Sequence, residues 1–172
     1  MSPDLLVITA SHGENLLLAE RFAASAQGRG LHAEVLDLTE QPLPLYTSRR
    51  HEAGGIPAEV AGLSQRLAAA PRWLICAPEY NGSIPPVLTS AIAWLSVLGD
   101  DFRSLFNGRP VAIATHSGGG GVEVLTVLRI QLAHLGAHVV GRQLVATRAK
   151  PAKDESIDDL VAQLSQLLPI EV

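Results

Sequence analysis

The sequence is poor in cysteine, in aromatic residues and in charge. Its single cysteine among 172 residues, Cys76, has no partner for an internal disulfide, and its place inside the apolar stretch RWLICA predicts a buried thiol without a redox role. Aromatic residues make up 4% of the chain and charged residues 17%, with a formal net charge of −4. A chain without excess positive charge lacks the basic face that nucleic-acid phosphates require, so we expect no nucleic-acid partner.

Long apolar runs are also missing. No stretch reaches the roughly 20 apolar residues of a membrane-spanning helix, so we expect no membrane partner. The amino terminus, MSPDLLVITAS, lacks the cationic start and the long apolar region of a signal peptide, so we expect a cytoplasmic protein. The length and the 47% apolar content are typical of one globular domain, here residues 1–172.

Short apolar runs alternate with amphipathic segments along the chain. The expected strands are 4–10, 31–38, 73–77, 110–115 and a weaker one at 139–146 that Gly141 interrupts. The expected helices are 15–28, 58–70, 87–98, 122–135 and 157–168, and 39–57 is expected to be a loop. This alternation with short connections predicts an α/β fold, a doubly wound parallel sheet with helices on both faces.

Polar, glycine-bearing loops follow the first, third and fourth expected strands. Their sequences are SHGEN (11–15), PEYNGS (78–83) and HSGGGG (116–121). Turns between strands and helices favour glycine, serine and asparagine, which is enough to explain any one of these loops. In an open α/β sheet, however, ligands bind outside the carboxyl ends of the strands. Three such loops at one edge therefore indicate a binding site.

The first loop has the features of a small anion site. The free N–H groups and the dipole of a helix start attract an anion, to which Ser11 and Asn15 can donate hydrogen bonds while Gly13 permits close approach. The patterns GxxxxGK[ST] and GxGxxG are both missing, so a single phosphate monoester fits better than a triphosphate or a dinucleotide. His12 is either a phosphate donor or an exposed loop residue.

The second loop is a candidate for binding a flat heterocycle. Pro78 ends the hydrogen bonding of the strand and Gly82 permits a tight turn, which leaves the backbone groups of Glu79, Tyr80, Asn81 and Gly82 free. The side chain of Tyr80 can then pack along the heterocycle. The alternative is a capped turn with Tyr80 folded into the core.

The third loop, Ser117 followed by Gly118, Gly119, Gly120 and a further glycine, is costly in chain entropy. Such a run suits a backbone that passes close to a flat ligand or a loop that moves, and a merely tolerated flexible loop is the alternative. His116 is expected to end the preceding strand. No side chain is nominated as a catalytic acid or base, or as a metal ligand.

The stretch PEYNGSIPPVLTSAIAWLS (78–96) closely resembles the motif of the NADPH-dependent FMN reductase family, a branch of the flavodoxin-like proteins. Residues 117–140 are similar to the last flavin loop of that family and the helix behind it. The resemblance implies a five-stranded sheet in the order 2-1-3-4-5 with one FMN per subunit. It places the phosphate on Ser11 and Asn15 and the isoalloxazine ring on residues 78–82 and 117–120.

The resemblance also implies an enzyme in which FMN takes a hydride from NAD(P)H and passes electrons to a small-molecule acceptor such as a flavin or a quinone. It implies a homodimer or homotetramer, in whose contact Trp94 could be buried. The family's phosphate loop is longer and carries an arginine, whereas SHGEN has neither Lys nor Arg.

Two other functions stay open. The first is a flavodoxin-type electron carrier, which the modest charge of −4 and the 4% aromatic content disfavour. The second is a non-catalytic protein of the same fold with an impaired flavin site, an alternative that the short first loop supports.

Overall fold

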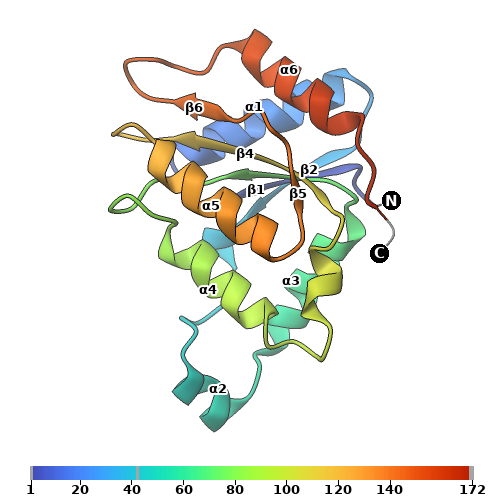
Figure 1. The fold of residues 1–172 in the computed structure, drawn as a ribbon, viewed down its shortest axis with the longest axis vertical. Helices are drawn as coiled ribbons and strands as arrows, with labels where there is room; N and C mark the ends of the chain where they lie inside the picture. The colour runs from blue at the N-terminus through green and yellow to red at the C-terminus, as the bar shows by residue number, and fades with distance from the viewer. Residues whose placement is uncertain (1, 42, 171–172) are drawn as a thin grey trace.

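A parallel sheet between two layers of helices forms the protein in the computed structural model, which describes residues 2–41 and 43–170 (Figure 1). The strands are β1 (Leu5–Thr9), β2 (Ala33–Asp37), β3 (Trp73–Cys76), β4 (Pro110–His116), β5 (His138–Val139) and β6 (Leu144–Ala146). All pairs are parallel and the order is β2-β1-β3-β4-β5, with β6 also paired to β4. The predicted α/β class and strand order are confirmed.

The fifth position of the sheet is occupied by two short strands. β5 pairs with Pro110 and Val111 at the start of β4, and β6 pairs with residues 114–116 at its end. The chain between them, which contains Gly141, leaves the sheet. The interruption expected within 139–146 therefore divides this strand into two, and β6 covers the end of β4 from which a candidate loop departs.

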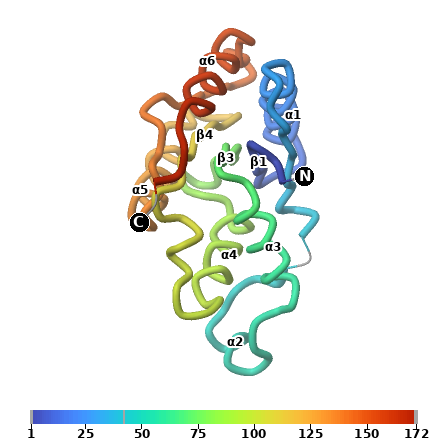
Figure 2. Tube along the Cα trace, turned by 90° about the vertical axis from the view of Figure 1, so that its right-hand side faces the viewer, coloured from blue at the N-terminus to red at the C-terminus, as the bar shows by residue number. Residues whose placement is uncertain are grey.

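Helices cover both faces of the sheet, as Figure 2 shows from the side. α1 (Glu14–Gly28) and α6 (Asp154–Ser165) lie on one face, and α3 (Ala58–Ala69), α4 (Pro86–Leu95) and α5 (Val122–His134) lie on the other. The side chains of β1 alternate between the two cores: Leu5 and Val7 belong to the first, and Leu6 and Ile8 to the second. Burial on both faces explains why the strands are continuous apolar runs.

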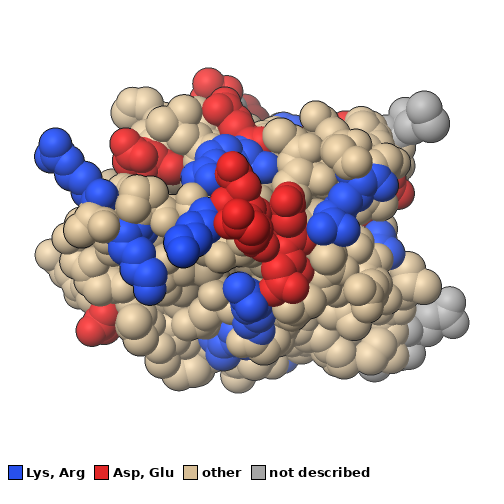
Figure 3. Space-filling view, turned by 90° about the horizontal axis from the view of Figure 1, so that it is seen from above, with Lys and Arg blue, Asp and Glu red and all other residues tan. Residues whose placement is uncertain are grey.

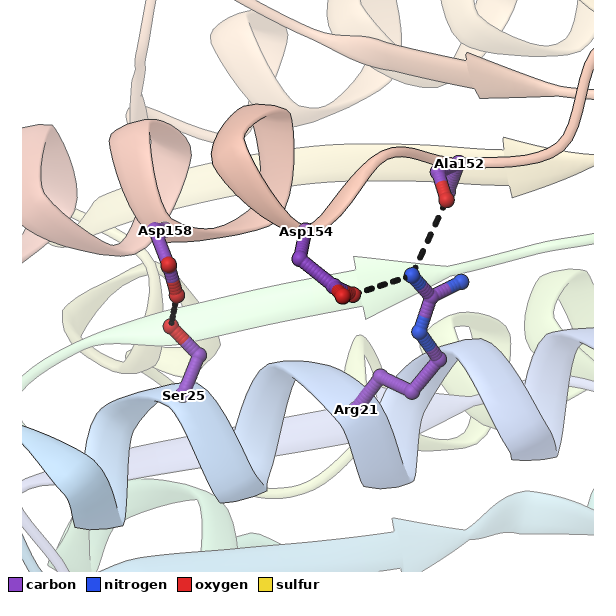
Figure 4. A network of polar contacts seen from close by, with 5 residues as sticks. All are labelled: Arg21, Ser25, Ala152, Asp154 and Asp158. Carbon is purple, nitrogen blue, oxygen red and sulfur yellow. Dashed lines mark hydrogen bonds and ion pairs between the residues drawn. The ribbon is translucent and has the colours of Figure 1, made fainter.

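Polar contacts join α1 to α6 at the surface. Arg21 donates to the carboxylate of Asp154 at 2.6 Å and to the carbonyl of Ala152 at 2.9 Å, and Ser25 donates to Asp158 at 2.5 Å (Figure 4). Seen from above, acidic side chains gather in the middle of this face with basic side chains around them (Figure 3). Exposed ion pairs contribute about 0–1 kcal/mol each, so the apolar contacts beneath them hold the two helices to the sheet.

The segment 39–57, expected to be a loop, contains helical structure. A 3-10 turn η1 (Leu38–Glu40) and the short helix α2 (Ser48–Gly54) lie within or beside it. The hydroxyl of Thr47 caps α2 by accepting the N–H of Arg50, and Gly55 ends it at φ 72°. No residue of α2 is buried, so the segment has no apolar periodicity from which a helix could be predicted. A second 3-10 turn, η2 (Phe102–Leu105), precedes β4.

Trp94 is fully buried within its own chain, which corrects the expectation that a subunit contact buries it. Its indole N–H donates to the carbonyl of Pro44 at 2.7 Å, and the ring of Tyr46 meets it edge-on with centroids 5.0 Å apart. The segment before α2 therefore covers this tryptophan. Trp94, a residue of α4, thus binds that segment to the helix. The side chain of Trp94 is not accessible to a second subunit.

Leu128 and Ile130 of α5 allow a matched test of the core. Leu128 is completely buried, whereas Ile130 is 65% exposed. We expect Leu128→Ala to lower the free energy of unfolding by about 2–5 kcal/mol, because it removes buried methyl groups and leaves a cavity. Ile130→Ala is expected to change it by less than about 0.5 kcal/mol in the same urea titration. Equal effects of the two substitutions would contradict the orientation of α5.

Candidate functional site

The three polar loops lie together at the carboxyl edge of the sheet, on the left in Figure 1. The pairing register produces this arrangement, since Thr9 of β1 lies beside Cys76 of β3, which in turn lies beside Ala114 of β4. The three strands therefore end at the same edge of the sheet, within a few residues of these paired positions. The sequence prediction that the three loops share one edge is confirmed, as the pairing of parallel strands requires.

The first loop leaves backbone donors free at the start of a long helix. α1 begins after Gly13, and no side chain caps its first turn. Ser11 is half-buried, while His12 and Gly13 are exposed, and a Cβ added to Gly13 would meet no atom within 4 Å. Thr9 shapes the turn by donating its hydroxyl to the carbonyl of Ser11 at 2.8 Å. The uncapped N–H groups and the open space beside them suit a small anion.

Asn15 joins the first loop to the end of β4. Its side chain is 2% exposed, its amide N–H₂ donates to the carbonyl of His116 at 2.9 Å, and its amide oxygen accepts the N–H of His116 at 2.8 Å. This amide therefore positions two loops relative to each other. The sequence nominated Asn15 as an anion donor, and its contacts in the structure give it this clamping role.

The second loop is a miniature hairpin. Tyr80 and Ser83 exchange two backbone hydrogen bonds of 3.0 Å each. Between them Asn81 and Gly82 both have positive φ, 52° and 71°, the backbone of a type I′ turn, for which Asn-Gly is the preferred pair. The sequence prediction that the backbone groups of Tyr80 are free is therefore wrong, because both are bonded to Ser83. Its side chain is 51% exposed at the site, which excludes the alternative in which Tyr80 folds into the core.

The third loop is held at both ends and open in the middle. The N–H of Ser117 donates to the carbonyl of Ala146 in β6 at 3.0 Å, and its buried hydroxyl accepts the N–H of Gly119 at 3.2 Å. Gly118 and Gly120 are exposed, and a Cβ on Gly118 would meet nothing within 4 Å. The middle of the run therefore presents bare backbone at the edge of the sheet.

Gly121 was not nominated from the sequence, yet it has the strictest requirement for glycine in this loop. Its φ is +69°, and a Cβ there would lie 2.7 Å from the methyl group of Thr115 and 3.2 Å from Cβ of Ser117. A side chain at this position would push the loop away from β4. The signal was present in the sequence as the fourth glycine of the run, immediately before the helix.

An open groove of about 600 Å³ borders the first loop on the side of α1 and α6. Glu14, Arg21, His116 and Arg148 are among the residues that line it. Glu14 lies with a carboxylate oxygen 3.8 Å from Nε2 of His116, and Arg21 is engaged with Asp154. Arg148 therefore brings a cation to a groove that also borders the first loop, which has no Lys or Arg of its own.

Other chemistries have no comparable basis in the described residues. Within 2–41 and 43–170, no group of three or more His, Cys, Asp and Glu side chains is arranged to hold a metal ion. None of the helices described is long and apolar enough to cross a membrane. Cys76 is buried as predicted, and burial raises the pKa of its thiol, which disfavours the reactive thiolate.

The site fits a planar ring that carries one phosphate. The uncapped start of α1 can take the phosphate, and the bare backbone at Gly118 and the exposed ring of Tyr80 leave a surface against which a flat heterocycle can lie. One further feature has no partner within the protein: the Oε2 atom of Glu79, which is buried without a hydrogen bond among the described residues.

The fold is that of a flavodoxin-like α/β protein, with the candidate ligand site at the carboxyl edge of its sheet. The chain belongs to the NADPH-dependent FMN reductase family, whose sequence model matches residues 3–151. Among relatives, a quinone reductase from Escherichia coli K12 is 35% identical over 123 residues, which span 67% of this chain and 64% of that protein. An NAD(P)H-dependent FMN reductase from Pseudomonas aeruginosa is 32% identical over 143 residues, which span 80% of this chain and 74% of that protein.

Solved structures agree on the fold. The flavoenzyme FerB, an NAD(P)H:acceptor oxidoreductase from Paracoccus denitrificans, superposes with a TM-score of 0.76 at 21% identity, covering 96% of both chains. An archaeal flavodoxin superposes with a TM-score of 0.64 at 11% identity, covering 94% of both. At these identities the likeness concerns the backbone arrangement, which is flavodoxin-like in both cases.

The hairpin at Asn81 and Gly82 gives a direct test of the site's backbone. We expect Gly82→Ala to lower the free energy of unfolding by about 1–2 kcal/mol, because alanine is strained at positive φ. The nearest atom to the added methyl group, Cβ of Glu123, is 4.0 Å away, so the effect comes from the backbone and not from a clash. Thermal and urea unfolding measure the difference. Gly118→Ala, at a glycine without positive φ, is the control, and an equal loss there would contradict the turn described.

Proposed function

We propose that this chain is an NAD(P)H-dependent oxidoreductase that binds FMN at the three loops and reduces a small-molecule acceptor such as a quinone or a flavin. The observation that supports this most is the conformation of the family motif, in which a left-handed Asn81-Gly82 turn leaves Tyr80 exposed and the Glu79 carboxylate lies 3.4 Å from a Cβ position on Gly119 of the glycine loop. The family match and the printed names of the relatives, quinone reductase and FMN reductase, support the same class of reaction.

The residues proposed to hold FMN follow the three loops. For the phosphate these are Ser11, His12 and Gly13 with the first N–H groups of α1, where the helix dipole favours negative charge. For the ring they are residues 78–82 on one side and 117–120 on the other. Asn15 contributes by fixing the first loop to β4 through its two hydrogen bonds with His116.

When bound, FMN supplies the hydride chemistry, and the chain supplies position and surroundings. Loop backbone at glycine residues can approach the ring closely because no side chain intervenes. The exposed ring of Tyr80 can cover part of one face and exclude water from it. The side chains at the site need only bind and orient the reactants, so no residue is proposed to transfer a proton.

A flavodoxin-type electron carrier is the second candidate. The archaeal flavodoxin that superposes on this chain supports that fold but shares 11% identity, and the family match favours the reductase. A non-catalytic protein with an impaired flavin site is the third, and the absence of Lys and Arg from SHGEN is its support.

Three further properties stay predictions. We infer that residues 1–172 act as one flavodoxin-like domain and that the protein is cytoplasmic. We also infer that it assembles as a homodimer or homotetramer through a surface other than Trp94, which its own chain buries.

The decisive experiment is anaerobic reduction of the FMN-loaded protein. We expect NADH or NADPH alone to bleach the flavin absorbance, because a reductase takes the hydride directly from the nucleotide, and we expect added quinone to restore it. Bound flavin that neither nucleotide bleaches would favour the carrier. A protein that takes up no FMN at millimolar concentration would favour the non-catalytic alternative.

A further inference from the structure

Glu79 places a carboxylate between the hairpin and the glycine loop. Its Oε1 atom lies 3.4 Å from the position that a Cβ on Gly119 would occupy, so the carboxylate lies directly against the backbone of that loop. Its Oε2 atom is buried and has no hydrogen-bond partner among residues 2–41 and 43–170. One oxygen of this carboxylate thus lies against the glycine loop, and the other is buried without a hydrogen bond.

Such an arrangement is unfavourable for folding alone. Buried polar atoms in proteins are almost always paired, and a carboxylate oxygen without a donor loses its hydration without compensation. No Lys, Arg or His among the described residues forms an ion pair with Glu79. On the other flank of the glycine loop lies a second carboxylate, that of Glu123, whose Oε2 lies 3.9 Å from a Cβ position on Gly120. The contacts within the folded chain therefore do not explain why a glutamate occupies position 79.

The glycine loop has donors that match this acceptor. The N–H of Gly119 is used by the hydroxyl of Ser117, but the N–H groups of Gly118 and Gly120 have no protein acceptor among the described residues. Glycine backbone can rotate at little cost, so these donors can turn toward Glu79 when the loop is ordered. A ligand that lies on the loop would order it.

We propose that Glu79 is a positioning residue for FMN binding: its carboxylate accepts N–H hydrogen bonds from the glycine loop when the flavin is bound. In the flavin-free protein the same carboxylate is held without a full set of partners. Its free energy of interaction therefore differs between the two states, and this difference favours the bound form. The inference rests on the proposed flavin site and adds to it the residue that links its two ring-contacting loops.

This role predicts opposite changes in stability and in affinity. Glu79→Leu, which removes both oxygens, is expected to leave the melting temperature of the flavin-free protein unchanged or higher, because an unpaired buried acceptor is lost. The same substitution is expected to weaken FMN binding by about tenfold to a hundredfold, because the loop loses its acceptor. Glu79→Gln keeps the shape and one acceptor oxygen, and its FMN affinity is expected to fall between that of the wild type and that of Glu79→Leu. A residue with a purely structural role would lower the melting temperature instead.

The test is fluorescence titration of each protein with FMN together with thermal unfolding of the flavin-free forms. Glu123→Gln, an exposed glutamate on the other flank of the same loop, is the control and is expected to match the wild type in both measurements. Wild-type affinity in both Glu79 variants would overturn the inference and leave the flavin site standing. Lower melting temperature with unchanged affinity would also overturn it. Failure of the wild type to bind FMN would overturn the inference and the proposed function together.

Discussion

A single buried amide joins the first and third loops of the candidate site. Asn15 forms two hydrogen bonds with the backbone of His116, at 2.9 and 2.8 Å, and so ties the start of α1 to the end of β4. β3 lies between β1 and β4, so this clamp spans the strand from which the hairpin leaves. The first and third loops are therefore held to each other at their bases before any ligand arrives, which lowers the free energy that binding must spend on bringing them together.

Preorganisation extends to the backbone of the second and third loops. The hairpin has left-handed residues at Asn81 and Gly82, and Gly121 has a conformation and a closeness to Thr115 that exclude a side chain. Conformations of this kind are costly, and they persist where the surroundings hold them in place. Here they direct Tyr80 and the bare backbone of residues 118–120 toward the same edge, while Glu79 stays without a complete set of partners between them.

Much of this arrangement could be predicted from the sequence. Apolar runs and glycine-bearing turns gave the sheet and the edge at which the loops meet, because a parallel sheet leaves few topologies. The resemblance of residues 78–96 added the strand order, which the structure confirms. The helix α2 was missed because it buries no residue, and the role of Asn15 was missed because its partner lies 101 residues away in the sequence. Contacts of that range leave no periodic signal. The covering of Trp94 by Tyr46 was missed for the same reason.

The most direct test of the account is amide hydrogen exchange with and without FMN, read at the three loops together. If one planar, phosphorylated ligand is held jointly, exchange should slow at residues 11–15, 78–83 and 117–121 at the same FMN concentration. The surface helix α2 should be unaffected. Slowing at only one of the loops, or at none while FMN is bound, would contradict the claim that they form a single site.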